Sequence, residues 1–277
     1  MADPVKRAAV ITHGRRETAD EALARLEAVA QESGVELVMP ADELEKHEIR
    51  LTEAEPAEAD IVVVLGGDGT MLRALRRLLG TTVPAIGVNY GSVGFLTTIP
   101  EEALEPGVKR VFAGDYELVD LPTLEARAGE DRRDAVNDIV ATSSTLGRMI
   151  ELSWTVGGED LGTLRCDGLI AATPSGSTAY NLSNGGPVLV WGLDALTVTF
   201  VAPHSLQARP LVIPRGSDVV VTNLTPDVWV TSLADGHVFS EVAPGGSMTI
   251  RLGPQRTLLA TLPEATFFSR YRHTFAS

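Results

Sequence analysis

The chain has 277 residues, 44% of them hydrophobic, and a formal net charge of -14 at pH 7. This size allows a large core in one or two domains, and the acidity excludes the broad basic surface that binds nucleic acid or anionic membranes. The single cysteine, Cys166, excludes an internal disulfide, and no stretch approaches the ~20 apolar residues that span a bilayer. We therefore expect a cytoplasmic protein with no nucleic-acid or membrane partner, so that any anionic ligand must bind at a local site.

The first part of the chain, residues 1–115, alternates short apolar runs with helical patterns, as βαβ units do. Thr18 and Glu21 stand at capping-box spacing before one helical pattern, and Gly34 marks its end. This order predicts an α/β domain with a parallel sheet. Its expected strands are 8–12, 35–40, 59–65 and 83–89, and its expected helices are 18–34 and 70–80. The acidic stretch 41–60 has the charge pattern of a solvated loop or helix face.

Helical periodicity mostly disappears over residues 116–260, where apolar runs are bounded by Gly, Asp and Pro. We expect a second, largely β domain there. Its predicted strands lie in 124–129, 135–142, 150–158, 196–203, 218–224, 228–236, 247–253 and 257–262. The hydroxyl-rich stretch 173–190 predicts one short helix inserted among these strands. The last residues, 261–277, are expected to form a C-terminal segment that packs back on the first domain.

The stretch GGDG directly follows the most apolar predicted strand. Glycine lets a backbone approach a ligand closely, and Gly66, Gly67 and Gly69 would lie at the carboxyl edge of a parallel sheet, where amides bind phosphate. Asp68 has the wrong charge to anchor a phosphate, so we interpret it as a proton acceptor or a ligand to phosphate-bound Mg²⁺. The loop lacks the Walker A lysine and the G-x-G-x-x-G spacing. A simple Asp-Gly turn is the alternative.

Five longer stretches carry a resemblance when they are taken in order. They are GGDGT (66–70), GVNYGSVGFLT (87–97), VNDIV (136–140), DGLIAATPSGSTAYNLSNGGP (167–187) and PHSLQARPLVIP (203–214). In this order they resemble the NAD kinases, ATP-dependent enzymes that phosphorylate the adenosine 2′-hydroxyl of NAD to give NADP. GGDGT is shared with diacylglycerol, sphingosine and 6-phosphofructokinase relatives, whereas the long stretch is more specific. DGH (235–237) fits a further, weaker feature of the family.

The resemblance implies the NAD kinase-like fold, with an α/β N-terminal domain and a largely β C-terminal domain. It implies that Mg²⁺ and ATP bind at the glycine loop and that NAD lies between the domains. Asp68 would be the catalytic base, and the donor side would be lined by Gly66, Gly67, Gly69 and Thr70. Since a carboxylate that faces ligand holds no core together, we expect its replacement to leave stability almost unchanged.

The same resemblance implies a set of residues that bind NAD. They are Asp68, Gly69, Phe95, Asn137, Asp138, Asp167, Ser175, Thr178, Ala179, Tyr180, Ser183 and Asp235. Phe95 is open to a second interpretation as a core residue, and Ser175 as a helix cap. Two positions depart from the family. Asp138 stands where glutamate is usual, which shortens its reach, and Cys166, expected to be buried and inert, stands where glycine is common.

The resemblance also implies a homodimer or homotetramer in which Asp167 and Tyr180 lie near a neighbouring subunit. Two other functions remain open from the residues. One is a catalytically weak dinucleotide-binding sensor, which only the change at Asp138 supports, and the other is a lipid kinase that shares the GGDGT loop. The sequence does not distinguish ATP from polyphosphate as the donor, or NAD from NADH as the acceptor.

Overall fold

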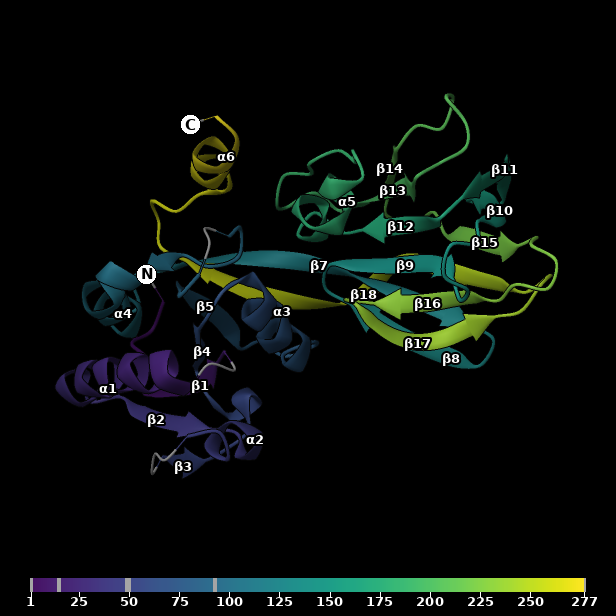
Figure 1. The fold of residues 1–277 in the computed structure, drawn as a ribbon. Coiled ribbons are helices and arrows are strands. Elements are labelled where there is room, and N and C mark those ends of the chain that lie inside the picture. Colours follow the sequence, from purple (N-terminus) through teal and green to yellow (C-terminus); the bar gives the residue numbers. More distant parts are fainter. Residues whose placement is uncertain (1, 14–15, 48–50, 92–93, 277) are drawn as a thin grey trace. The chain divides into compact units, whose positions relative to one another are not determined.

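The computed structural model describes residues 2–13, 16–47, 51–91 and 94–276. Its chain divides into two compact units (Figure 1). Unit 1 contains residues 1–120 and 257–277, and unit 2 contains residues 121–256. The C-terminal residues therefore belong to the same compact unit as the N-terminal ones, and strands β7 and β18 have residues in both units.

Unit 1 contains the predicted parallel sheet, in the order β3-β2-β1-β4-β5, with β6 beside β5. The end of β18 also pairs with β5 in parallel, Leu258 opposite Pro84. Strands β1 and β4 are almost continuously buried, as expected of parallel strands whose two faces are both covered. The strands are β1 (Arg7–Thr12), β2 (Glu36–Met39), β3 (Thr52–Glu53), β4 (Ile61–Leu65), β5 (Pro84–Asn89), β6 (Ile99–Pro100) and β18 (Ser247–Thr261).

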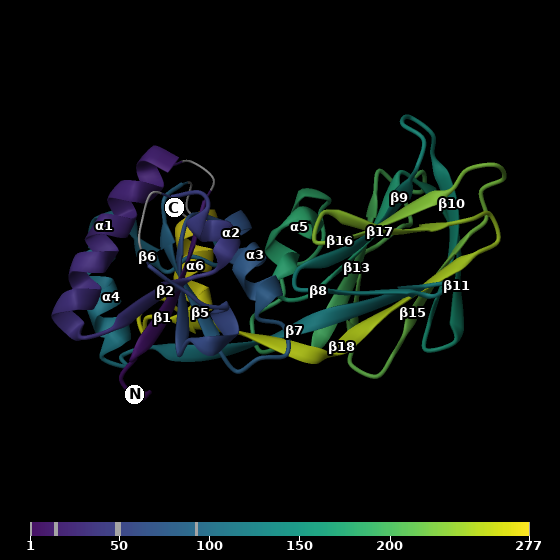
Figure 2. The same cartoon turned by 90° about the horizontal axis from the view of Figure 1, so that it is seen from below.

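Helices cover both faces of this sheet, with α1 and α4 on one side and α2 and α3 on the other (Figure 2). Helix α1 begins at Arg16, two residues before Thr18, where the sequence predicted its start. The predicted side-chain cap at Thr18 lies outside the side chains that the structure describes. Helix α3 also begins two residues earlier than predicted, and α4 and α6 were not predicted. The helices of unit 1 are α1 (Arg16–Ser33), α2 (Ala41–Leu44), α3 (Asp68–Arg77), α4 (Leu104–Phe112) and α6 (Phe267–Phe275), with short 3-10 turns at Pro56–Glu58 and Glu101–Ala103.

The acidic stretch 41–60 is not uniformly solvated, because Glu43 in α2 has no exposed surface. Its Oε2 accepts hydrogen bonds from the amide and the hydroxyl of Thr12, and its Oε1 pairs with Lys46 and Arg73 at 2.7 and 2.8 Å. Burial raises the pKa of Glu43, but these partners outweigh it and hold the pKa below its usual value. Glu43 thus ties α2 to the end of β1. Residues 48–50 of this stretch lie outside the described residues.

Unit 2 is built from two antiparallel sheets with a hydrophobic core between them. One sheet has the order β14-β13-β12-β9-β16-β17, and the other contains β11-β10-β15-β18 together with β7 and β8. Trp154 of β10 meets Phe200 of β13 edge to face at 5.4 Å, so the two sheets share one core. The two runs predicted at 247–253 and 257–262 form the single strand β18.

The strands of unit 2 confirm its largely β character and include several that were not predicted separately. They are β7 (Glu117–Ala128), β8 (Asp131–Ala135), β9 (Asp138–Ser143), β10 (Ile150–Val156), β11 (Glu159–Cys166), β12 (Gly168–Ala172), β13 (Ala195–Val201), β14 (Leu211–Pro214), β15 (Val219–Asn223), β16 (Val230–Ala234) and β17 (His237–Val242). The inserted helical segment is present as a 3-10 turn at Gly176–Thr178 and the short helix α5 (Tyr180–Ser183). Cys166 is fully buried at the end of β11, and burial raises the pKa of its thiol to about 12.

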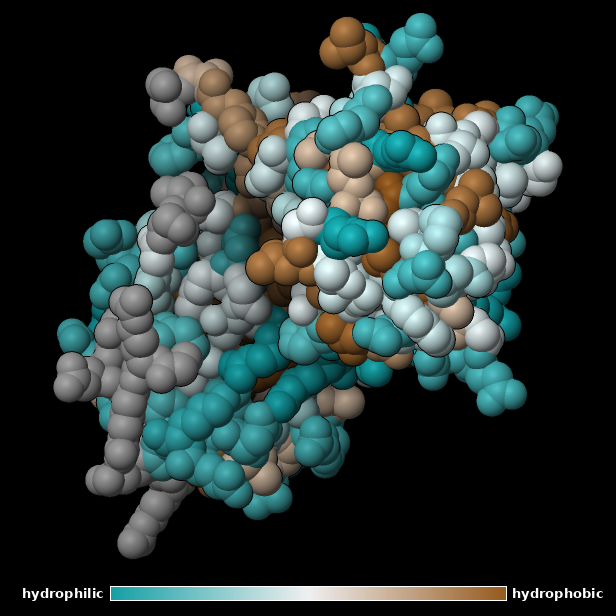
Figure 3. Space-filling model, turned by 45° about the vertical axis from the view of Figure 1, so that its right-hand side comes forward, coloured by the Kyte–Doolittle hydropathy of each residue, from teal (hydrophilic) through white to brown (hydrophobic). Residues whose placement is uncertain are grey.

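Exposed hydrophobic side chains are scattered rather than gathered on the face drawn in Figure 3, where they form separate brown spots among polar residues. Leu146 and Leu206 are the most exposed large hydrophobic residues. Such isolated residues are ordinary on protein surfaces. Among the described residues no helix is long and apolar enough to cross a membrane.

Candidate active site

The glycine loop joins the buried strand β4 to helix α3 at the carboxyl edge of the parallel sheet. Gly66 must be glycine, because a Cβ there would lie 2.5 Å from the hydroxyl of Thr70. Gly67 and Gly69 have a different role, since a Cβ at either position would meet nothing within 4 Å. Asp68 is the first residue of α3, so the carboxylate and the amides of the first helical turn occupy the same few positions.

The Asp68 carboxylate is held by a second loop of unit 1. Its Oδ2 accepts a hydrogen bond from the amide of Phe95 at 2.7 Å, and its Oδ1 accepts from Leu96 and Thr97 at 3.0 and 3.3 Å. Gly94 leaves room for this arrangement, because a Cβ there would lie 2.1 Å from Oδ1. Asp68 therefore does not face ligand alone. We expected replacement of Asp68 to leave stability almost unchanged because the carboxylate would face only ligand. That premise is wrong, because the carboxylate holds residues 95–97 by hydrogen bonds.

Phe95 packs into the fold of unit 1 and is only 6% exposed. Its ring lies 5.9 Å from that of Phe267 and 5.6 Å from that of Phe275, both on α6. This favours the interpretation of Phe95 as a core residue. Within the stretch 87–97, Ser92 and Val93 lie outside the described residues.

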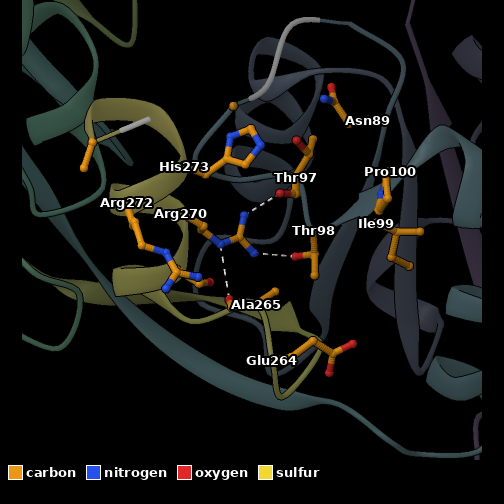
Figure 4. A pocket seen from close by; sticks show the side chains of 13 residues that line it. Asn89, Thr97, Thr98, Ile99, Pro100, Glu264, Ala265, Arg270, Arg272 and His273 are labelled. Atoms are coloured by element: carbon orange, nitrogen blue, oxygen red, sulfur yellow. Dashed lines mark hydrogen bonds between the residues drawn. The ribbon is translucent and has the colours of Figure 1, made fainter.

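Helix α6 and the segment after Gly94 line an open pocket of about 690 Å³ within unit 1. Figure 4 shows Arg270 reaching from α6 to Thr97 and Thr98, with a further hydrogen bond to Ala265. The remaining wall of the pocket includes Asn89, Pro100, Glu264 and His273. Sequence reasoning missed α6 and Arg270 altogether, since no motif marks them.

In unit 2 a second carboxylate organises the predicted binding residues. Asp235, in the turn after β16, is buried and accepts hydrogen bonds from the amides of Val136, Asn137 and Asp138 at 2.9, 2.7 and 3.2 Å. Its backbone φ of 47° lies in the left-handed region, where aspartate is among the better tolerated residues. Asp235 was predicted to bind NAD, but all these contacts are to the chain itself.

Asp138 lies beside Asp235 and is also buried. Burial, and to a smaller extent the charge of Asp235, raises the pKa of Asp138 to about 7. Asp138 is consequently far easier to protonate than an ordinary aspartate. A carboxyl group with such a pKa is available both as an acceptor and as a donor near neutral pH.

The hydroxyl-rich stretch meets Asn137 directly. Ser175 donates to Asn137 Oδ1 at 3.1 Å, and Gly176 must be glycine because a Cβ would lie 2.1 Å from the Asn137 carbonyl oxygen. The hydroxyl of Thr178 donates to the carbonyl of Ser175 at 3.1 Å. Ser175 makes no side-chain cap, so its interpretation as a helix cap is wrong. These residues form one group with Asp138 and Asp235.

The other predicted residues of unit 2 are more exposed. Ala179 is half-buried, whereas Tyr180, 46% exposed, and Ser183 open to the surface on α5. Asp167 is exposed and precedes β12, while the hydroxyl-rich stretch follows that strand. Five extended residues, roughly 17 Å, thus separate Asp167 from the group around Asn137. Within unit 2 the fold gathers most of the predicted residues but not Asp167.

Comparison with known proteins decides the family. Residues 8–116 match the family model described as "ATP-NAD kinase N-terminal domain", and residues 136–262 match "ATP-NAD kinase C-terminal domain". A NAD kinase of Gemmatimonas aurantiaca is 37% identical over 81% of this chain and 79% of its own length. One from Heliobacterium modesticaldum is 40% identical over 76% of each chain. The chain belongs to the NAD kinase family.

Solved structures of the family agree with this fold. An NAD kinase from Archaeoglobus fulgidus, solved in complex with ATP, is 28% identical with a TM-score of 0.77 over 98% of this chain and 97% of its own. A yeast NADH kinase complexed with NADH has a TM-score of 0.86 over 99% of this chain and 89% of its own, at 21% identity. The two-domain NAD kinase fold is therefore confirmed.

The family match removes the support for a lipid kinase, because the second family model also covers the long hydroxyl-rich stretch, which is more specific than the shared GGDGT loop. NAD kinases are ATP-dependent phosphotransferases, and this is the class of reaction assigned to the chain. Among the described residues no three His, Cys, Asp or Glu side chains form a metal-binding cluster. A Mg²⁺ ion requires no such cluster where substrate phosphates and one or two carboxylates supply its ligands.

Proposed function

We propose that the chain transfers the γ-phosphoryl group of ATP to the adenosine 2′-hydroxyl of NAD, with Asp68 as the catalytic base. The observation that carries this proposal is the fixed Asp68 carboxylate at the first turn of α3. In that position a proton acceptor and a set of phosphate-binding amides share one loop. The hydroxyl oxygen would attack the γ-phosphorus, its proton would pass to Asp68, and ADP would leave.

The donor side is assigned to Gly66, Gly67, Gly69 and Thr70. Nothing blocks the side of Gly67 or Gly69 on which a Cβ would stand, so phosphate oxygens can approach their backbone. The positive end of α3 favours an anion there. This explains how a chain with a net charge of -14 can hold a nucleoside triphosphate without a basic surface.

The base is assigned to one oxygen of Asp68. Its Oδ1 accepts two amides, whereas Oδ2 accepts one, at 2.7 Å. A carboxylate oxygen has two lone-pair positions, so Oδ2 keeps one for the acceptor hydroxyl. The amides fix the direction of that lone pair, and positioning of this kind supplies most of the rate in phosphoryl transfer.

Magnesium fits the proposed donor side. A half-buried carboxylate at the phosphate loop is the type of ligand that Mg²⁺ takes together with phosphate oxygens, and Asp68 is the residue that would contribute it. When bound, the ion would neutralise charge on the transferring phosphoryl group. ATP rather than polyphosphate is the proposed donor.

The adenosine portion of NAD is assigned to unit 2. Asn137 and Ser175 already share a hydrogen bond, and together they offer amide and hydroxyl groups to a base or ribose. Asp138 is proposed to reach the ribose directly or through a water molecule. Thr178, Ala179, Tyr180 and Ser183 complete this side. Asp235, Gly69 and Phe95 are proposed to support NAD binding by holding the segments around it.

Asp167 is proposed to act at the site of a neighbouring subunit, because it lies at the opposite end of β12 from the group around Asn137. We therefore propose a homodimer or homotetramer in which Asp167 and Tyr180 lie close to a subunit contact. The enzyme is proposed to work in the cytoplasm.

The function is tested by incubating the purified protein with NAD, ATP and Mg²⁺ and measuring NADP with an NADP-specific dehydrogenase. NADP formation is the expected result. Parallel reactions with NADH and with polyphosphate determine acceptor and donor preference. Binding of NAD by calorimetry without NADP formation would instead identify the catalytically weak sensor.

A further inference from the structure

The segment 95–98 is held from two sides in unit 1. On one side its amides donate to the Asp68 carboxylate. On the other side Arg270 of α6 donates to the carbonyl oxygens of Phe95, at 2.8 Å, and Thr97, and to the hydroxyl of Thr98 at 2.7 Å. The segment therefore lies between a carboxylate that accepts hydrogen bonds from its amides and a guanidinium that donates hydrogen bonds to its carbonyl oxygens.

Arg270 is an unusual residue to bury, with only 8% of its surface exposed. Burial lowers the pKa of its guanidinium to about 10, and the charge of Asp68 acts in the opposite direction. Three of its hydrogen bonds go to one short segment, the carbonyl oxygens of Phe95 and Thr97 and the hydroxyl of Thr98. A buried guanidinium that donates to so short a segment fixes the backbone of that segment as well as attaching α6.

Aromatic packing fixes the same segment from the side of α6. Phe267 and Phe275 pack on Phe95, and the N-terminal end of the helix is capped by the Thr266 hydroxyl, which accepts from the Ser269 amide. Arg270 comes one helical turn after Phe267, so both side chains face the 95–98 segment. The helix thus presents a rigid surface to this segment.

We propose that Arg270 is a positioning residue, which holds segment 95–98 so that its amides orient the Asp68 carboxylate for proton transfer. This inference rests on the catalytic role proposed above for Asp68. Arg270 touches neither substrate nor reacting atoms in this scheme. It acts through the segment, and the C-terminal helix thereby becomes part of the catalytic apparatus although it is distant from every motif in the sequence.

The test compares Arg270→Met, Arg270→Lys and Arg272→Met in the full chain. Arg270→Met keeps the apolar stem and loses the guanidinium, so we expect kcat to fall by roughly 10- to 100-fold with the KM for NAD changed less than about threefold. Arg270→Lys keeps the charge and should recover part of that loss. Arg272 lies on the same helix and is exposed, so Arg272→Met should have parental kinetics.

A double variant separates positioning from general stability. If Arg270 acts through Asp68, adding Arg270→Met to Asp68→Asn should lower kcat by less than about twofold, because the group to be oriented is already absent. Independent, multiplying losses would overturn the proposal, as would parental kcat in Arg270→Met. Near-normal turnover of Asp68→Asn alone would instead overturn the base assignment, so the two failures are distinguishable.

Should Arg270→Met not fold, Thr98→Val supplies the same information at smaller scale. It removes only the hydroxyl that accepts from Arg270 and keeps the side-chain shape. We expect kcat to fall by roughly two- to tenfold, the effect of one hydrogen bond, at unchanged KM for NAD. An unchanged kcat in a folded Thr98→Val protein would contradict the proposal.

Discussion

Two aspartates, one in each unit, use their carboxylates in the same way and for different ends. Asp68 accepts the amides of residues 95–97, and Asp235 accepts those of residues 136–138. Asp68 is the first residue of α3 and Asp235 directly follows β16, and each accepts hydrogen bonds from three successive amides. The backbone arrangement alone therefore does not identify a catalytic carboxylate.

Their surroundings separate the two. Asp68 is half-buried beside two glycines whose Cβ positions are open, whereas Asp235 is 7% exposed and has a second carboxyl group, Asp138, as its neighbour. An open side leaves Asp68 able to meet a substrate. The enclosed carboxylate of Asp235 holds residues 136–138, and its charge raises the pKa of Asp138. Access and neighbouring charge, rather than the hydrogen bonds, support the different roles that we propose for the two residues.

The largest expected effect is the loss of turnover when the Asp68 carboxylate is replaced. Asp68→Asn keeps the shape but loses the base, so turnover should fall by ~10²-fold or more. It should also lower the free energy of unfolding by about 1 to 3 kcal/mol, because an amide NH₂ faces a backbone donor. NADP formation and urea unfolding measure the two effects. Asp42→Asn, which removes a half-exposed carboxylate of α2, is the matched control with parental turnover.

Parental turnover in a folded Asp68→Asn protein would exclude the base role. Unchanged stability with lost turnover would show that the three amides find other acceptors when the carboxylate is absent.

The next largest effect is a loss of stability when the Asp235 carboxylate is replaced. Asparagine tolerates the left-handed backbone, so Asp235→Asn removes charge without adding strain. We expect the free energy of unfolding to fall by about 3 kcal/mol at pH 5, the upper range for hydrogen bonds to a charged group. At pH 8 the loss should be smaller, because the variant relieves repulsion with ionised Asp138. Urea midpoints at both pH values test this, and an equal loss at each pH would contradict it.

The sequence predicted the parallel sheet and the glycine loop because both depend on a local pattern, a run of apolar residues followed directly by GGDG. It did not predict what the Asp68 carboxylate binds, since Phe95 is 27 residues away and its amide carries no side-chain signal. Arg270 is 175 residues from Phe95 and stands in no motif. Only the folded chain brings such pairs together.

Charge patterns misled the prediction where burial decides the outcome. Glu43 sits among many acidic residues and was expected to be solvated, yet Thr12, Lys46 and Arg73 enclose it. The stretch around Asn137 was assigned from resemblance, and the network that joins it to Ser175 and Asp235 depends on the pairing of β9 with β12 and β16. Strand neighbours of that kind are not specified by a local pattern.

A third effect is the pH dependence of stability that arises from Asp138, the neighbour of Asp235. The pKa of Asp138 rises from its ordinary 3.8 to about 7 because of burial and Asp235. The unfolded chain therefore releases this proton at lower pH than the folded one, so the contribution of Asp138 is fully present below about pH 4 and is lost as pH rises to about 7. Asp138→Asn should gain on the order of 2 kcal/mol relative to the parent between pH 5 and pH 8. A difference in urea midpoint that does not change with pH would refute this.

The smallest expected effect is a loss of NAD affinity on replacing Tyr180, which has no buried carboxylate and belongs to neither aspartate's group of hydrogen bonds. The residue is 46% exposed on α5, so Tyr180→Ala should hardly change stability, but it removes an aromatic surface and a hydroxyl from the proposed NAD side. We expect NAD affinity to weaken by about 1 kcal/mol. Leu193→Ala, which truncates a similarly exposed residue of the same unit, should bind NAD as the parent does.

If a neighbouring subunit completes this side, specific activity should also fall on dilution as light scattering reports dissociation. A monomer that stays fully active at nanomolar concentration would exclude that contribution while leaving the chemistry of Asp68 intact, because Asp68 and the amides that hold it belong to unit 1 of a single chain.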